Sequence, residues 1–279
     1  MNKSTAEPIR LEFIEVAPGI RLHVRDWGQG RPIVLIHGWP LSNEMYDYQM
    51  MELAEKGFRA ISISLRGFGK SDKPWGLYNY DVYADDLKAI LDQLDLKDVT
   101  LVGFSMGGAI SIHYMARHKG SRVSKLALVG AAAPVWTKRE DYPYGLELSE
   151  ADALIKAVDL DRPQLFTDFG KIFGRSETSV NPGLAAWLHS LGMQASPYAV
   201  AQSVVALRDT DLRPELTTIA VPTAIFHAVG DKVCPFAFAE EMARRIKNAR
   251  IIRFENSGHG LFLEEKQKFN HELIKFISG

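Results

Sequence analysis

The sequence predicts an α/β fold with a mostly parallel sheet flanked by helices. Strand-like and helix-like segments alternate along the first half of the chain, a helical stretch without a buried strand follows, and the alternation then returns. Such alternation favours right-handed strand–helix–strand units. We expect a core domain formed by residues 1–133 and 212–279, with a helical cap, residues 134–211, inserted after the sixth strand.

The first two predicted strands form an antiparallel pair. Ile9–Val16 and Ile20–Trp27 have alternating patterns and are separated by an Ala-Pro-Gly turn. Pro32–Ile36 is a continuous apolar run, which is typical of a strand buried on both faces. The segments that follow continue the alternation. Helices are expected at Glu44–Lys56, Tyr80–Leu96 and Met106–His118, and strands at Phe58–Leu65, Val99–Phe104 and Val123–Val129.

The predicted cap contains only helices. They are expected at Ser149–Val158, Leu165–Phe173, Gly183–Leu191 and Pro197–Leu207. The core then resumes with strands at Thr223–Ala228 and Ala249–Phe254 and helices at Pro235–Lys247 and Leu261–Ile277. Because ligands bind at the carboxyl edge of such sheets, a cap over this edge predicts a site beneath it.

Composition narrows the functional classes. The 279 residues carry a net charge of −1, with 33 basic and 34 acidic residues, which argues against nucleic acid or a membrane surface as a partner. One cysteine, Cys234, allows no intrachain disulfide and fits a reducing compartment. No segment resembles a signal peptide or a membrane span, so we expect a cytoplasmic protein. Without a metal-binding motif, neither a metal nor another cofactor is expected.

The segment Gly103-Phe104-Ser105-Met106-Gly107 predicts a nucleophilic serine. It leads from an apolar strand into a helix, and such a turn exposes one hydroxyl beside backbone N–H groups. A serine hydroxyl is a weak nucleophile, so it needs a neighbouring base and an acid that orients the base. Ser105 is therefore the candidate nucleophile, and a histidine and a carboxylate should follow it in the chain.

Among the eight histidines, His259 fits the base best, because it lies between two glycines in the loop after the last predicted strand. Asp231 follows the strand Thr223–Ala228 and is placed to hold an imidazole. The alternative for Asp231 is a turn or helix-capping residue before Pro235. No carboxylate follows the preceding strand, so Asp231 is the predicted acid.

The loop His37-Gly38-Trp39-Pro40, after the strand Pro32–Ile36, completes the predicted site. We expect the backbone N–H groups of Trp39 and Met106 to form an oxyanion hole. His37 is interpreted as a support of this loop rather than a base, and Cys234 as a small buried side chain. Aromatic side chains line an apolar pocket or pack in the core, with neither alternative favoured. They are Trp39, Phe104, Trp136, Phe166, Phe169, Phe173 and Trp187.

On these motifs, together with Arg122-Val123 and Leu126–Pro134, the chain resembles the α/β-hydrolase superfamily over nearly its whole length. Within that superfamily it is similar to the branch of cofactor-free haloperoxidases, or perhydrolases, and aryl esterases. The resemblance implies a triad of Ser105, Asp231 and His259 and the hydrolysis of small esters, with peracid formation in the presence of peroxide. Residues 141–220 carry no motif that identifies the substrate.

The predicted function is serine hydrolysis of a small-molecule carboxylic ester with an apolar part, through an acyl-enzyme. Lactone or carbon–carbon bond hydrolysis with the same triad is an alternative. Epoxide and haloalkane hydrolases have a similar His-Gly-Trp-Pro loop but use an aspartate nucleophile, so Ser105 argues against these two activities. A slow ligand sensor on the same fold is the alternative from another class.

Overall fold

The computed structural model describes residues 10–279 and contains one eight-stranded sheet of order β1-β2-β4-β3-β5-β6-β7-β8. β2 is antiparallel to both of its neighbours, and every pair from β4 to β8 is parallel. The predicted start of the first strand, Ile9, lies outside the described residues. The strands are β1 (Phe13–Ala17), β2 (Ile20–Gly28), β3 (Pro32–Ile36), β4 (Arg59–Ile63), β5 (Val99–Phe104), β6 (Val123–Val129), β7 (Thr223–Ala228) and β8 (Ala249–Phe254).

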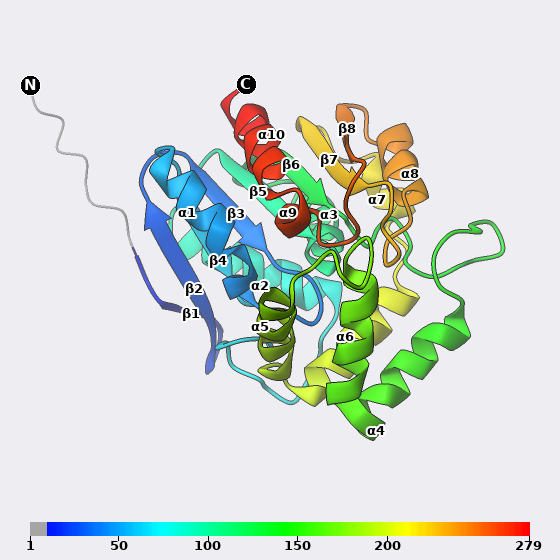
Figure 1. Ribbon diagram of the computed structural model, residues 1–279. Helices are drawn as coiled ribbons and strands as arrows, with labels where there is room; N and C mark the ends of the chain where they lie inside the picture. Colours follow the sequence, from blue (N-terminus) through cyan, green and yellow to red (C-terminus); the bar gives the residue numbers. More distant parts are fainter. Residues whose placement is uncertain (1–9) are drawn as a thin grey trace, which may run out of the picture.

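Helices cover both faces of this sheet (Figure 1). Two predicted helices are divided in the structure: a 3-10 turn precedes α1, and α9 is separated from α10 at Glu265. The helices are η1 (Asn43–Tyr46), α1 (Asp47–Glu55), α2 (Tyr80–Gln93), α3 (Met106–Arg117), α4 (Leu148–Phe173), α5 (Pro182–Met193), α6 (Pro197–Asp209), α7 (Arg213–Leu216), α8 (Ala237–Arg245), α9 (Leu261–Glu264) and α10 (Lys266–Ser278).

The central strands divide their side chains between two apolar layers. In β3, Val34 and Ile36 pack with the layer that includes α2, α3 and α8, whereas Ile33 and Leu35 pack with the layer that includes α1 and α10. Successive side chains of a strand point to opposite faces, and both faces here are covered, so both sets must be apolar. This explains the unbroken apolar run that predicted β3.

Between β6 and β7 the chain forms α4, α5 and α6, which gather at one end of the sheet (Figure 1). α4 joins two predicted helices across a bend at Asp161, whose backbone is not helical (φ −159°, ψ 80°). Pro163 interrupts the helical hydrogen bonds there, and the Asp161 carboxylate accepts the Gln164 N–H, starting the second half. The domain bounds at 134 and 211 stay a prediction.

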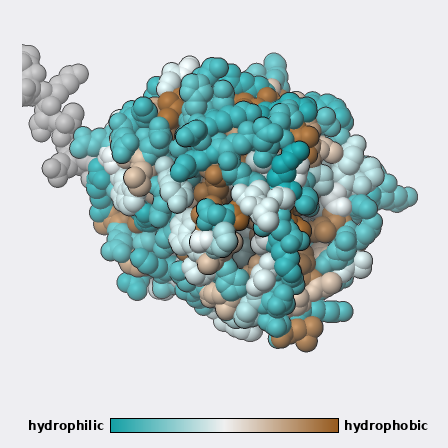
Figure 2. All heavy atoms as spheres, in the orientation of Figure 1, coloured by the Kyte–Doolittle hydropathy of each residue, from teal (hydrophilic) through white to brown (hydrophobic). Residues whose placement is uncertain are grey.

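Hydrophilic residues cover most of the molecular face in Figure 2, with smaller hydrophobic areas between them. Within residues 10–279, none of the helices has both the length and the apolar composition that crossing a bilayer requires.

Candidate active site

Ser105 occupies the single residue between β5 and α3, at the carboxyl edge of the sheet. Its backbone lies at φ 52°, ψ −117°, a conformation that costs a non-glycine residue about 1–3 kcal/mol. Neighbouring segments hold it there: the Ser105 N–H donates to Val129 C=O at 2.9 Å, and the Ala132 N–H donates to Ser105 C=O at 3.0 Å. The strand-to-helix turn predicted around Ser105 is therefore present.

Close backbone contacts explain the glycines on either side of Ser105. A Cβ atom on Gly107 would lie 2.4 Å from the Ile36 carbonyl oxygen, and one on Gly103 would lie 2.3 Å from the Gly107 carbonyl oxygen. Both neighbours are backbone atoms that cannot turn aside. Glycine at these positions lets α3 pack directly on β3 and β5, which fixes where Ser105 projects.

His259 and Asp231 form a buried hydrogen bond, with 2.8 Å between His259 Nδ1 and Asp231 Oδ2. The other carboxylate oxygen of Asp231 accepts the N–H groups of Val233 and Cys234, each at 2.8 Å. Asp231 thus combines the two interpretations that its sequence position allows, since it orients a histidine and also stabilises a turn. Within residues 10–279, the buried Nε2 atom of His259 has no hydrogen-bond partner.

Charges around Asp231 keep its carboxylate ionised. Burial by itself would raise the Asp231 pKa, but the charge and hydrogen bond of His259, together with the Cys234 N–H, lower this pKa below its ordinary value. The neighbouring thiol behaves in the opposite way. Burial and the Asp231 charge raise the pKa of Cys234 well above its ordinary value, against a smaller effect of the Ser105 side chain. Cys234 is therefore a protonated, buried residue rather than a reactive thiolate.

The loop after β3 packs against Ser105. A Cβ atom on Gly38 would lie 2.8 Å from the Ser105 Cβ atom. In the part of the chain that the structure describes, no protein acceptor receives the backbone N–H of Trp39 or of Met106. The Met106 N–H belongs to the residue after Ser105, and the Trp39 N–H belongs to the loop that packs against Ser105. Two unpaired N–H groups beside a serine are what an oxyanion requires, although their catalytic role stays a prediction.

His37 supports this loop from inside the protein. Its Nε2 atom accepts the Leu65 N–H at 3.0 Å, and its Nδ1 atom donates to the Gly38 carbonyl oxygen at 2.9 Å. Burial lowers the pKa of His37 to about 4, so the ring is neutral. Both ring nitrogens are used in these contacts, which leaves His37 no free group to act as a base.

A cavity of about 450 Å³ opens above Ser105. Trp39, Ala132 and Val233 line its sheet side, and side chains from α4, including Leu154 and Phe169, line the opposite side. Its wall is mostly apolar. The charged groups are Glu150, Asp168 and Lys232. An apolar chamber with one buried hydroxyl at its base suits a substrate with a large apolar part.

The predicted aromatic residues divide between pocket and core. Trp39, Trp136 and Phe169 line the cavity above Ser105. Phe166 and Phe173 line a smaller adjoining cavity of about 40 Å³ between α4 and α5. Phe104 is fully buried with its ring 4.7 Å from the His259 ring, and Trp187 contacts Tyr48 on the outside of α1.

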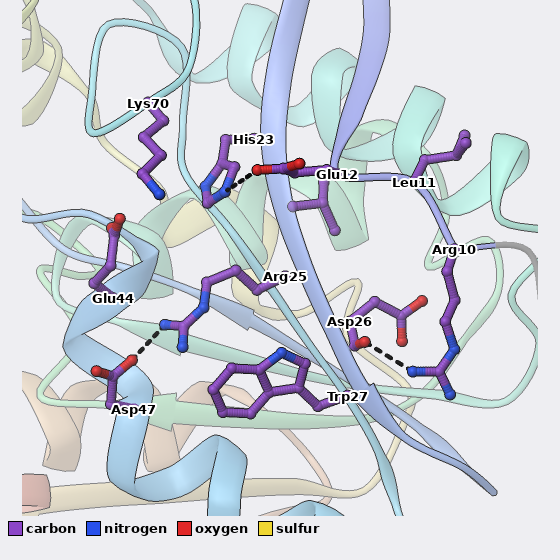
Figure 3. Close-up of a pocket in the computed structure, with 11 residues that line it drawn as sticks. Arg10, Leu11, Glu12, His23, Arg25, Asp26, Trp27, Glu44, Asp47 and Lys70 are labelled. Carbon is purple, nitrogen blue, oxygen red and sulfur yellow. Dashed lines mark hydrogen bonds and ion pairs between the residues drawn. The ribbon is translucent and has the colours of Figure 1, made fainter.

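A second large cavity, of about 480 Å³, lies beside β2 (Figure 3), and Ser105 is not among the residues that line it. Two pairs form among its charged residues: Arg25 contacts Asp47, and His23 Nε2 lies 3.9 Å from Glu12 Oε1. The Arg10 guanidinium points to the Asp26 carbonyl oxygen. Of the two cavities, the one above Ser105 has the better arrangement for catalysis.

Comparisons with known proteins agree with this fold and site. A family model described as alpha/beta hydrolase fold matches residues 31–182, and one described as TAP-like protein matches residues 199–278. The AB hydrolase superfamily protein YisY of Bacillus subtilis (strain 168) is 49% identical over 96% of this chain and 99% of its own. A non-heme haloperoxidase of Rhodococcus erythropolis is 34% identical over 96% of this chain and 100% of its own length. The solved structure of the esterase EaEST of Exiguobacterium antarcticum is 46% identical in sequence. It superposes with a TM-score of 0.93 and covers 96% of this chain and 99% of the esterase chain.

The chain therefore belongs to the α/β-hydrolase family. It is a hydrolase of the esterase type, similar to non-heme haloperoxidases, and this confirms the resemblance and the fold class that the sequence predicts.

One buried polar residue beside Asp231 has no predicted role. His227 is assigned from the sequence only to a strand, yet its Nε2 atom lies 3.7 Å from Asp231 Oδ2. The four-residue spacing between His227 and Asp231 is the one available signal, and it becomes informative only once the turn between them is known.

Proposed function

We propose that this hydrolase cleaves carboxylic esters with Ser105 as nucleophile, His259 as general base and Asp231 as the residue that orients the base. One observation carries the proposal: His259 is fixed through Nδ1 to Asp231, while its buried Nε2 has no partner among the described residues. A ring held in this way has one nitrogen available for the Ser105 hydroxyl. Catalytic hydrogen bonds often form fully only when substrate is present.

In this mechanism His259 takes the proton of Ser105 as the serine oxygen attacks the ester carbonyl carbon. The N–H groups of Trp39 and Met106 receive the tetrahedral oxyanion, and removing one such donor typically costs about 3–4 kcal/mol. His259 then protonates the departing alcohol. In the second half His259 takes a proton from the water that attacks the acyl-enzyme. The bond between the acyl group and Ser105 then breaks, and His259 returns the proton to Ser105 as the carboxylic acid leaves.

The cavity supports a small-molecule ester with an apolar part as substrate. Its volume of about 450 Å³ and its apolar wall favour an aliphatic or aryl group over a charged one. Most of this wall belongs to residues 134–211, which we propose act as a cap that selects the substrate, while the residues of the sheet edge perform the chemistry.

A panel of chromogenic esters, varied in acyl and alcohol size, tests this proposal. We expect Ser105→Ala to lose at least about a thousandfold in kcat. Ser190→Ala, which changes an exposed serine of α5, is the matched control and should keep wild-type turnover. Undiminished turnover by Ser105→Ala would refute the mechanism. A stoichiometric burst followed by near-zero turnover would instead favour the ligand sensor.

Perhydrolysis is a second candidate activity, supported by the likeness to the Rhodococcus haloperoxidase. Here hydrogen peroxide replaces water in attacking the acyl-enzyme, and the products are a peracid and free Ser105. The peracid would then oxidise bromide. Acetate, peroxide and bromide are supplied together, and bromination of a dye is followed. Bromination no faster than with Ser105→Ala would contradict this activity.

A further inference from the structure

His227 lies at the end of β7, fully buried behind Asp231. Its Nε2 atom is 2.8 Å from the Cys234 carbonyl oxygen and 3.7 Å from Asp231 Oδ2. Among residues 10–279, its Nδ1 atom has no hydrogen-bond partner. The ring therefore contacts the Asp231–Cys234 turn through one nitrogen alone.

The hydrogen-bond partner of His227 Nε2 determines which ring nitrogen carries the proton. A carbonyl oxygen only accepts hydrogen bonds, so the proton must lie on Nε2. Burial lowers the pKa of His227, against smaller opposing effects of Asp231 and the Cys234 carbonyl, so the ring is neutral. Nδ1 is then a buried acceptor without a donor, which costs about 1–3 kcal/mol. An apolar side chain, like those of its neighbours Ile225 and Phe226, would avoid this cost.

The His227 ring stabilises the Asp231–Cys234 turn. The turn holds the carboxylate from within, since the Val233 and Cys234 N–H groups both donate to Asp231 Oδ1. His227 holds the same turn from outside, through the Cys234 carbonyl. The position of the His227 ring is itself fixed, because β7 pairs with strands on both sides. The Phe236 ring also packs edge-on against it, with 5.8 Å between the ring centres.

We propose that His227 is a positioning residue for the triad: its Nε2–H fixes the Asp231–Cys234 turn, so that Asp231 Oδ2 stays aimed at His259. This inference rests on the proposed function. The neutral form matters, because a charged His227 would compete with His259 for the same carboxylate. His227 acts through Asp231 and does not contact the cavity above Ser105.

Three substitutions separate positioning from bulk packing. His227→Gln keeps an amide N–H able to reach the Cys234 carbonyl, His227→Leu removes the donor, and His227→Asn keeps an amide that is too short to reach. We expect kcat for a chromogenic ester to fall about tenfold in the Leu and Asn variants, with KM changed less than about twofold. His227→Gln should recover to within about threefold of wild type. Thr223→Val, which removes another buried polar group of β7, is the control and should keep wild-type kcat.

A spectroscopic measurement reports the geometry directly. The proton between His259 Nδ1 and Asp231 Oδ2 should give a far-downfield proton resonance in the wild type and in His227→Gln. We expect this resonance to broaden or move upfield in His227→Leu and His227→Asn. A role confined to packing would not distinguish Gln from Leu in this spectrum, because the two side chains are similar in size.

The inference is overturned if His227→Leu or His227→Asn, neither of which has a donor that reaches the Cys234 carbonyl, folds and has wild-type kcat, or if His227→Gln loses as much activity as they do. Ser105→Ala measured in parallel separates the two proposals. A fully active Ser105→Ala refutes the triad and with it the role of His227. An inactive Ser105→Ala combined with a fully active His227→Leu refutes only the role of His227.

Discussion

The indole Nε1–H of Trp39 donates to the Val200 carbonyl oxygen of α6 at 3.1 Å. The same indole packs edge-on against Phe166 and Phe169 of α4, at 5.8 and 5.3 Å between ring centres. Trp39 also carries one of the two proposed oxyanion donors on its backbone. A single side chain therefore joins the helices over the site to the loop beside Ser105.

We predict that Trp39→Phe lowers kcat about fivefold, because the loop loses a hydrogen bond worth about 1 kcal/mol that fixes its position. Ester kinetics of the purified variant measure this effect. Trp187→Phe, which changes a half-buried indole of α5, is the matched control. Equal kinetics for Trp39→Phe and the wild type would show that the Val200 contact does not position the loop.

Filling the cavity should change which esters are accepted. Ala157 lines it from α4, and Ala157→Phe would occupy part of its volume of about 450 Å³. We expect KM to rise for esters with long acyl or aryl groups, while acetates of small alcohols are hydrolysed as by the wild type. The ester panel measures this difference, and a uniform change for all esters would place the substrate elsewhere.

Two glycines should respond oppositely to alanine. A Cβ atom on Gly107 would meet backbone carbonyls at 2.4 and 2.6 Å, so Gly107→Ala should lower the free energy of unfolding by about 2 kcal/mol or more. Around Gly170, inside α4, no atom of the described residues lies within 4 Å of such a Cβ, apart from the backbone of the adjacent turns of α4 itself. Gly170→Ala should raise stability by about 0.5–1 kcal/mol. Urea unfolding of both variants tests the pair, and the same sign for both would contradict it.

Mild acid should destabilise the protein through His37. Burial lowers its pKa in the folded state from 6.5 to about 4, so only the unfolded chain takes up this proton between these values. The contribution of His37 to stability is complete above about pH 6.5 and is lost as the pH falls towards 4. His227 acts in the same direction.

The test of the His37 effect is urea unfolding at several values between pH 7 and 5. In the wild type the free energy of unfolding should fall with pH, and His37→Asn, which lacks the titrating group, should show a shallower fall. Parallel slopes for the two proteins would mean that His37 is not the neutral buried residue described here.

The sheet was predictable because its inner strands are buried on both faces. β3, β5, β6 and β7 begin and end at the predicted residues, as does the edge strand β8, which is less buried and was predicted from its place after the helix Pro235–Lys247. The helices were less well defined. Continuous apolar spacing in Leu261–Ile277 does not reveal the break at Glu265, which depends on how α9 packs beneath the site.

The candidate site was predictable where a local motif carries the chemistry. The glycines around Ser105 and His259 and the strand-end position of Asp231 are visible in the sequence. His227 is different, because its role depends on a turn that returns the Cys234 carbonyl to the strand. Likewise, nothing in the sequence near Trp39 indicates Val200, 161 residues away, as its partner.

The pairing of β6 with β7 has a consequence for how this enzyme can diverge. Val129 and Phe226 are paired in register across the two strands, although the segment that forms α4, α5 and α6 lies between them in the chain. The two ends of that segment also lie side by side, because Val135 pairs with Asp211 in a β-bridge. Mutations, insertions or exchange of these helices can reshape the chamber without moving Ser105 relative to Asp231. The residues that line the chamber can therefore change in evolution while the residues of the proposed triad stay in place.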